Sequence, residues 1–145
     1  MRRFNIPKIV RPLDLAAYAP ELATEIGAAS PPIQMWVNMP RRKQAEYSVL
    51  ITQTNDLIKK LIEAVEKADV ETARQLTEAT NRVGTEIARW WSEAWSQGPE
   101  ESRWTVDEVE DFARRCQAED TALWDFIIQG CRALVREHRE SARKN

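Results

Sequence analysis

Proline is concentrated at one end of the chain, and this distribution most constrains the fold. Six of the seven prolines lie in the first 40 of the 145 residues, at positions 7, 12, 20, 31, 32 and 40. Because proline fixes φ and lacks a backbone N–H, no long helix fits there. Beyond residue 40 the only proline is Pro99, and glycine is scarce throughout. We therefore predict an N-terminal arm over residues 1–40 and a helical domain over residues 41–145.

Two short segments of the arm have the alternating pattern of β-strands. The residues that share a face are Phe4, Ile6 and Val10 in the first segment, and Ile33, Met35, Val37 and Met39 in the second. Period-two alternation predicts a short antiparallel pair. Asp14 precedes a predicted helical turn near residues 15–18. Since an isolated two-stranded sheet is only marginally stable, we expect the arm to pack on the helical domain.

Two amphipathic stripes follow the arm. Apolar residues recur every three or four positions, which is the spacing of one helix face, from Tyr47 to Val65 and again from Ala73 to Trp95. Asp69 is a typical N-cap, and Gly98 marks a helix end. We predict a helical hairpin over residues 41–97 that turns near residues 68–69. The first stripe also repeats every seven residues, which suits a hairpin within one chain or a dimer equally well.

The segment over residues 98–145 predicts a second helical pair. Thr105 and Glu108 have the spacing of a capping box, and Trp104 and Val109 are placed for a hydrophobic staple. We expect helices over about residues 106–117 and 121–141. Gly130 interrupts the apolar stripe of the second helix, which suggests close packing there. The predicted fold is mainly α, with a four-helix body and a proline-rich arm that holds a short β pair.

Composition excludes several classes of protein. The net charge is −2, so no overall field attracts the chain to nucleic acid or to an anionic membrane. No apolar run approaches the roughly 20 residues of a membrane span, and no signal-peptide core follows the start. Cys116 and Cys131 match no zinc spacing and are too few for a disulfide scaffold, so we expect buried thiols. We therefore expect a cytoplasmic protein without a cofactor.

Paired carboxylates support an enzymatic alternative. Glu63 with Glu66, and Glu108 with Asp111, have spacings that let two carboxylates hold a divalent cation, as in all-α nucleotide pyrophosphohydrolases. However, Glu63 and Glu66 lie off the apolar stripe, and the capping box already uses Glu108. His138 is the only histidine and has no partner at metal-ligand spacing. We expect solvated carboxylates and a structural histidine, with a metal-dependent hydrolase as the alternative.

Basic residues support a second alternative, a nucleic-acid-binding helical adaptor. Arg41, Arg42 and Lys43 open the first predicted helix. The last helix carries basic residues at three- and four-residue steps, which are Arg132, Arg136, Arg139 and Arg143. Phosphate binding would require both groups to share one face, with an affinity that falls steeply with salt. Otherwise, cations near a helix C-terminus are explained by the helix dipole.

Two tryptophans lack an obvious place in the core. Trp91 and Trp95 follow the apolar stripe of their helix, whereas Trp90 lies about 100° away on its flank. Trp36 alternates opposite Met35, so both faces of that segment are apolar. Aromatic residues are enriched at binding hot spots. We predict a protein-binding surface formed by Met35, Trp36 and Trp90.

Several short segments occur in a characteristic order. They are Arg11-Pro-Leu-Asp-Leu, Tyr18-Ala-Pro-Glu, Met35-Trp-Val-Asn-Met-Pro40 before a long helix, a hairpin with an aspartate at its turn, and Leu123-Trp-Asp-Phe-Ile-Ile. This order resembles the small helical tail assembly chaperones of long-tailed bacteriophages and prophages. The resemblance implies a non-enzymatic protein of the host cytoplasm that binds tape-measure and tail-tube proteins and is absent from the finished virion. It implies no catalytic residues.

Overall fold

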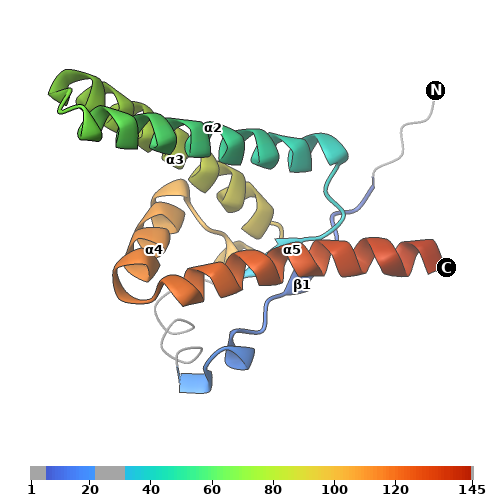
Figure 1. Cartoon of the computed structure of the whole chain (residues 1–145). Coiled ribbons are helices and arrows are strands. Elements are labelled where there is room, and N and C mark those ends of the chain that lie inside the picture. Colours follow the sequence, from blue (N-terminus) through green and yellow to red (C-terminus); the bar gives the residue numbers. More distant parts are fainter. Residues whose placement is uncertain (1–5, 22–31, 145) are drawn as a thin grey trace.

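The computed structural model describes residues 6–21 and 32–144, and the described chain is mainly helical (Figure 1). The helices are α2 (Arg41–Glu66), α3 (Val70–Trp95), α4 (Val106–Glu119) and α5 (Thr121–Lys144), with 3₁₀ turns η1 (Leu15–Ala17) and η2 (Glu100–Ser102). Strands β1 (Val10–Pro12) and β2 (Gln34–Trp36) pair antiparallel. The predicted fold class is confirmed. No helix within the described residues combines the length and apolar character that a membrane crossing requires.

Helices α2 and α3 form the predicted hairpin. Helix α2 begins directly after Pro40, and Ala68 turns the chain in a left-handed conformation with φ of 54°. The Asp69 carboxylate caps α3 by accepting a hydrogen bond from the Thr72 amide at 3.2 Å. Helix α3 ends at Trp95, and Gly98 does not adopt the positive φ of a glycine cap. A side chain at Gly98 would meet the end of the Gln34 side chain of β2, which would have to shift.

The β pair is part of the core rather than a separate unit. Alternation along the second predicted segment is confirmed, because Ile33, Met35, Val37 and Met39 are buried and the residues between them are half-exposed. Asn38 joins the two segments: its side-chain oxygen accepts from the Ile9 amide at 2.7 Å, and its amide donates to the Pro7 carbonyl at 2.8 Å. Phe4, part of the first predicted segment, lies outside the described residues.

Helices α4 and α5 form the second predicted pair. The Thr105 hydroxyl accepts from the Glu108 amide at 3.2 Å and the Glu108 carboxylate accepts from the Thr105 amide at 3.1 Å, which confirms the capping box. Asp120 joins α4 to α5, and its carboxylate accepts a hydrogen bond from the Tyr18 hydroxyl at 2.6 Å. A side chain at Gly130 would meet Leu13 at 2.6 Å, so the predicted close packing is confirmed and its partner is the arm.

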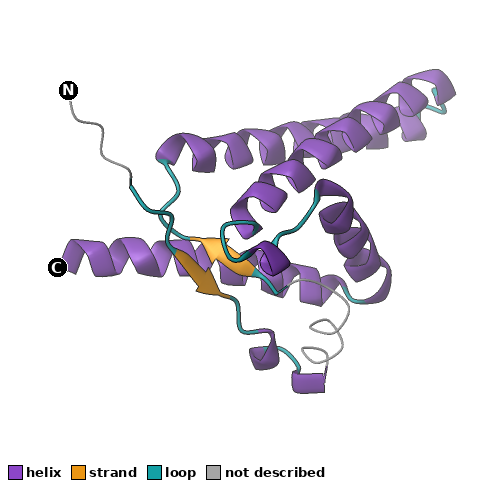
Figure 2. Ribbon diagram, turned by 180° about the vertical axis from the view of Figure 1, so that it is seen from behind, coloured by secondary structure: helices purple, strands orange, loops and turns teal. Residues whose placement is uncertain are grey.

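The helices are arranged around α3 and the small sheet. Helix α3 packs against α2, α4 and β2, while β2 also packs against α5 (Figure 2). Residues from the arm and from the helices share one hydrophobic cluster. A chain of aromatic rings with centroids 4.6–5.3 Å apart runs through this cluster, in the order Tyr47, Trp90, Trp91, Trp95, Trp104 and Phe112. The far end of the hairpin extends away from the body (Figure 1).

Candidate functional site

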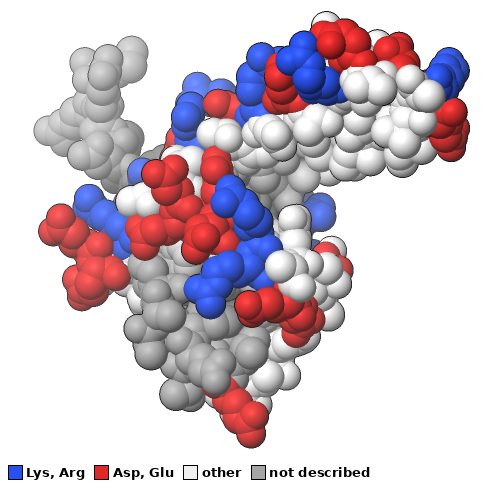
Figure 3. All heavy atoms as spheres, turned by 90° about the vertical axis from the view of Figure 1, so that its left-hand side faces the viewer, with Lys and Arg blue, Asp and Glu red and all other residues white. Residues whose placement is uncertain are grey.

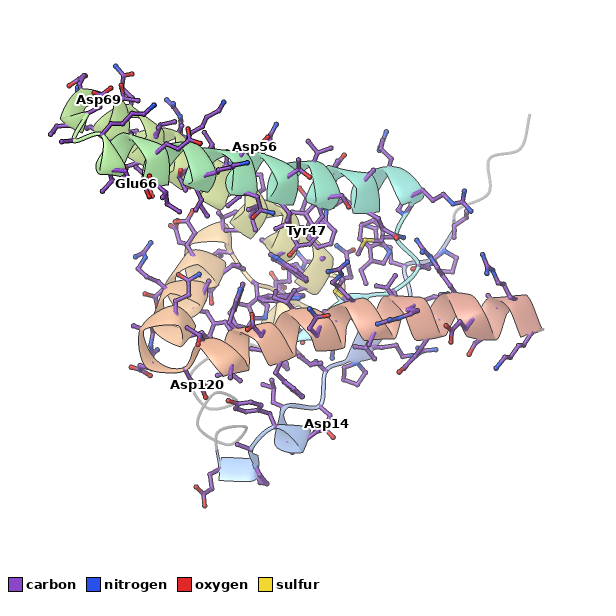
Figure 4. The ribbon with its side chains drawn as sticks, viewed as in Figure 1. Asp14, Tyr47, Asp56, Glu66, Asp69 and Asp120 are labelled. Atoms are coloured by element: carbon purple, nitrogen blue, oxygen red, sulfur yellow. The ribbon has the colours of Figure 1, made fainter. Side chains whose placement is uncertain are left out.

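A cleft of about 400 Å³ opens between the first turns of α2 and the middle of α5. Its apolar lining comes from four parts of the chain, namely Met35 and Met39 around β2, Tyr47 of α2, Trp90 of α3 and Val135 of α5. In Figure 4 the Tyr47 ring projects from α2 into the space between the hairpin and α5. Since these side chains come from distant segments, the cleft forms only in the folded chain.

Three arginines of α5 line the same cleft. Arg132, Arg136 and Arg139 follow one another at four- and three-residue steps, so they share one helix face. The Arg139 guanidinium donates a hydrogen bond to the Gln44 side chain of α2, across the cleft. None of the residues described as lining the cleft is acidic, and none of the three arginines pairs with a carboxylate of the described chain. The cleft therefore combines an apolar floor with uncharged polar side chains and uncompensated positive charge.

The positive charge along the cleft also affects Tyr47, a residue of the cleft floor. Burial raises the pKa of the Tyr47 hydroxyl, and the positive charge of Arg132 opposes that rise. The Tyr47 ring lies 4.6 Å from the Trp90 ring, centroid to centroid, so the two side chains together form an aromatic part of the cleft lining. Guanidinium groups beside apolar side chains suit a ligand that carries both carboxylates and apolar groups.

Two of the three residues predicted to form a protein-binding surface, Met35 and Trp90, are buried. Met35 is 1% exposed and Trp90 6% exposed. The Trp90 indole donates to the Lys43 carbonyl at 2.7 Å, because α2 packs over the flank of α3 that the sequence left uncovered. The edges of both side chains nevertheless contribute to the cleft floor. That proteins bind at Met35, Trp36 and Trp90 stays a prediction.

Trp36 is half-exposed, but it has partners in the fold. Its indole donates to the Asn38 side chain at 3.0 Å, and the Lys8 ammonium lies 4.7 Å from the centroid of its ring. Partly covered by Lys8, Trp36 packs against the hydrophobic cluster and is outside the α2–α5 cleft. It stabilises the β pair on the side away from Met35.

The four candidate metal-binding carboxylates do not converge. Glu63 and Glu66 are exposed near the end of α2, where Figure 4 shows Glu66 beside the hairpin turn. Glu108 serves the capping box of α4, and Asp111 is exposed on the same helix. Within residues 6–21 and 32–144, no group of three or more His, Cys, Asp or Glu side chains could hold a metal ion. The predicted carboxylate site is therefore not assembled.

The two basic groups do not share one face, because Arg42 and Lys43 of α2 line a groove beside α3, whereas the arginines of α5 line the cleft. Lys43 forms ion pairs with Glu93 of α3 and with Glu46, the latter at 3.7 Å. Arg42 and Lys43 line a shallow groove between α2 and α3, which also contains Glu86 and Glu93. Lys43 precedes Gln44 by one residue, or about 100° around the helix, and Gln44 faces the cleft. Lys43 therefore does not add its positive charge to the cleft that the arginines of α5 line.

The two cysteines are structural. Cys116 and Cys131 are buried free thiols, as predicted. Burial raises the pKa of Cys116 to about 11 and that of Cys131 to about 12, so both thiols stay protonated at neutral pH. His138 is half-buried on α5 and does not line the cleft.

The cleft was not predicted from the sequence, although the arginines that line it were recognised as one face of a helix. The arginine spacing on α5 was visible in the sequence, whereas the contribution of Gln44 and Tyr47 depends on where α2 lies relative to α5. Comparisons of the chain with protein-family models, curated protein sequences and solved structures found no match. Function is therefore inferred from the geometry of the cleft.

Proposed function

We propose that this chain is a non-enzymatic assembly factor whose α2–α5 cleft binds an acidic, partly apolar segment of a client protein. One observation supports this proposal: three arginines of one helix line a cleft that has an apolar floor and in which no described lining residue is acidic. Uncompensated guanidinium groups at a binding surface favour carboxylate ligands, and the apolar floor favours aliphatic or aromatic side chains between them.

The spacing of the arginines suits a helical client. Arg132 and Arg139 lie seven residue steps apart on α5, or about 10 Å along the helix axis, with Arg136 between them. Carboxylates at positions i, i+4 and i+7 of a client helix share one face and cover the same distance. Such a helix would place its apolar residues toward Met39, Tyr47 and Val135. This is the groove-binding mode of amphipathic helices.

The resemblance to tail assembly chaperones suggests which clients to test first. The resemblance implies tape-measure and tail-tube proteins as clients, and a long helical client can present an amphipathic face to a groove. A tail-tube gene upstream and a very long helical gene downstream of this one would support that assignment. The absence of both genes would remove tape-measure and tail-tube proteins as clients and leave the cleft proposal to the binding experiment.

The experiment uses a labelled amphipathic peptide with Leu on one face and Glu at i, i+4 and i+7. We expect saturable binding by fluorescence anisotropy, an affinity that falls as salt rises, and no binding of the matched peptide with Lys in place of Glu. Reversal of the three cleft arginines to Glu should lower the affinity at least tenfold. Arg143→Glu is the matched control, because Arg143 lies on α5 but does not line the cleft.

Two outcomes would overturn the proposal. One is equal binding of the Glu and Lys peptides, which would show that the arginines do not select the ligand. The other is tight binding of single-stranded DNA, competing with the Glu peptide at lower concentration and with a steep salt dependence. That result would assign the arginines to phosphate and favour the nucleic-acid-binding alternative.

A further inference from the structure

Helix α2 carries two apolar stripes, and α3 covers only one of them. The inner stripe faces α3, and its residues are buried or half-buried: Tyr47, Leu50, Thr54, Leu57, Leu61 and Ala64. The outer stripe consists of Ile51, Ile58, Ile62 and Val65. Of these, Ile58 is 42% exposed, Ile62 54% and Val65 64%. Figure 3 shows a continuous uncharged strip along one side of the protruding hairpin, with charged side chains along another.

The outer stripe lies on the same face of α2 as the cleft. Gln44 and Tyr47 line the α2–α5 cleft, and Ile51 follows Tyr47 by four residues. The later members follow at steps of seven, four and three, so the line from Gln44 to Val65 stays within about 60° of the helix surface. Between Tyr47 and Val65 this line extends about 27 Å along the helix axis. The apolar floor of the cleft therefore continues along α2 toward the hairpin turn.

Helix α3 carries small side chains beside this line. The Trp91 ring lies 5.2 Å from the Tyr47 ring, centroid to centroid, so the two helix faces meet there. Steps of seven, four, three and four back from Trp91 continue this face of α3 toward the turn, through Gly84, Thr80, Thr77 and Ala73. The Thr77 and Thr80 hydroxyls each donate to a carbonyl of α3 at 2.8 Å, so their hydrogens already have a partner. We call these four residues and the outer stripe of α2 the hairpin strip.

Gly84 gives the hairpin strip a place for close approach. Glycine destabilises a helix interior relative to alanine, and Gly84 does not have the positive φ that would favour glycine. A side chain at Gly84 would meet no other part of the described chain within 4 Å, so no contact within the fold requires its absence. A second helix that packs against α3 at this position would explain the glycine.

We infer that the hairpin strip binds the continuation of the client helix whose acidic segment occupies the cleft, and that this continuation is uncharged and apolar; the inference rests on the proposed function. Continuity identifies the occupant, because a helix seated in the cleft and directed toward the hairpin turn covers the line from Gln44 to Val65. No residue of the hairpin strip is charged, and a contiguous exposed apolar strip marks an interaction surface. The client is therefore a helix with two parts, an acidic one for the arginines and an aliphatic one for the strip.

Peptides of two lengths test the inference. The short peptide is the acidic amphipathic peptide described above. Two long peptides add about 18 residues, enough to cover the strip, with Leu and Ala on one helix face. The extension precedes the acidic segment in one long peptide and follows it in the other. By fluorescence anisotropy, we expect one of them to bind at least tenfold tighter than the short peptide. An extension of the same composition with its apolar residues spread around the helix should give no gain.

Variants of the chain separate the hairpin strip from the cleft. Ile62→Lys should remove the gain of the long peptide and leave binding of the short peptide unchanged. Val49→Lys is the matched control, because Val49 is 54% exposed and lines the groove on the other side of α2. Gly84→Leu should also remove the gain, because its side chain would occupy the place of the client. Since leucine favours a helix and Gly84 faces open space, the midpoint of thermal unfolding should not fall.

The two peptide lengths distinguish failure of this inference from failure of the proposed function. Binding of the short peptide with no gain from either extension would overturn the inference and leave the proposed function intact. A gain that survives Ile62→Lys would also overturn it. No binding of the short peptide would overturn the proposed function, and this inference with it. Dimerisation of the native chain in sedimentation velocity, abolished by Ile62→Lys and without a gain from the long peptides, would assign the strip to a second copy instead.

Discussion

The two ends of the α2–α3 hairpin have the same amphipathic pattern but very different packing. Where the hairpin joins the body, all the buried residues of α3 cluster between Ala88 and Trp95, and aromatic rings fill the space between helices. Toward the turn, Ala64 is the one residue of α2 that is fully buried. A depression of about 260 Å³ lies there between the two helices.

This difference shows that helical periodicity alone does not determine stability. At the body end, α3 is covered by α2, α4 and β2 together, so its large side chains lose all contact with water. At the turn end, among the described residues, each helix packs mainly against the other. We expect the body end to carry most of the free energy of folding, and the turn end to open locally at lower cost.

Truncation of one core ring should have the largest effect. Trp95 is fully buried, with the Trp91 and Trp104 rings 5.3 and 5.2 Å away. Trp95→Ala should lower the free energy of unfolding by about 3–5 kcal/mol, measured by chemical denaturation. Leu61→Ala, at a half-buried position toward the turn, should cost only about 1 kcal/mol. Equal costs for the two variants would contradict the comparison between the two ends.

A glycine at the hairpin turn should have a smaller and opposite effect. Ala68 has a φ of 54°, which costs an L-residue about 1–2 kcal/mol. Ala68→Gly relieves this cost but adds freedom to the unfolded chain, for a net gain of about 1 kcal/mol. Hydrogen exchange should show the gain in amides near the turn, with little change near Trp91. The control Ala45→Gly, at an exposed position inside α2, should instead lose stability.

The smallest effect should be the pH dependence of the α3 cap. The hydrogen bond from Thr72 lowers the pKa of Asp69 below its ordinary value of 3.8. Because the folded pKa is the lower one, the cap stabilises α3 fully above pH 3.8, and this stabilisation is lost as pH falls through the folded pKa. NMR of the Thr72 amide should follow this loss. Asp69→Asn keeps an acceptor without a titrating group and should remove the pH dependence.

Most of the fold follows from local signals in the sequence. The prolines predicted the arm, the Thr105–Glu108 capping box predicted the start of α4, and Asp69 predicted the hairpin turn. Each of these signals depends on residues that are close together in the sequence. Gly98 was assigned to a helix cap, whereas it has no positive φ and lies against the Gln34 side chain of β2. That contact joins residues far apart in the chain, so it could not be predicted from the residues near Gly98 in the sequence.

The candidate site was less predictable for the same reason. A helical wheel gives the direction of Trp90 relative to its own helix but not the number of neighbours around that helix. Since α2 covers the flank, Trp90 is buried and not exposed. The charge of the cleft could be predicted from the steps between Arg132, Arg136 and Arg139. Its apolar floor could not, because four separate segments contribute to it.

The position of β2 in the core has a consequence for folding during synthesis. Strand β2 contacts α3 and α5, and the Tyr18 hydroxyl bonds to Asp120 at the start of α5. The ribosome makes both arm segments before α2, α3 and α4, and makes their partner α5 only afterwards. Met35 and its neighbours can therefore pack against α3 before α5 emerges, but they stay partly uncovered until α5 is made. We expect the hairpin to form early and the arm to dock last, as long-range contacts generally do.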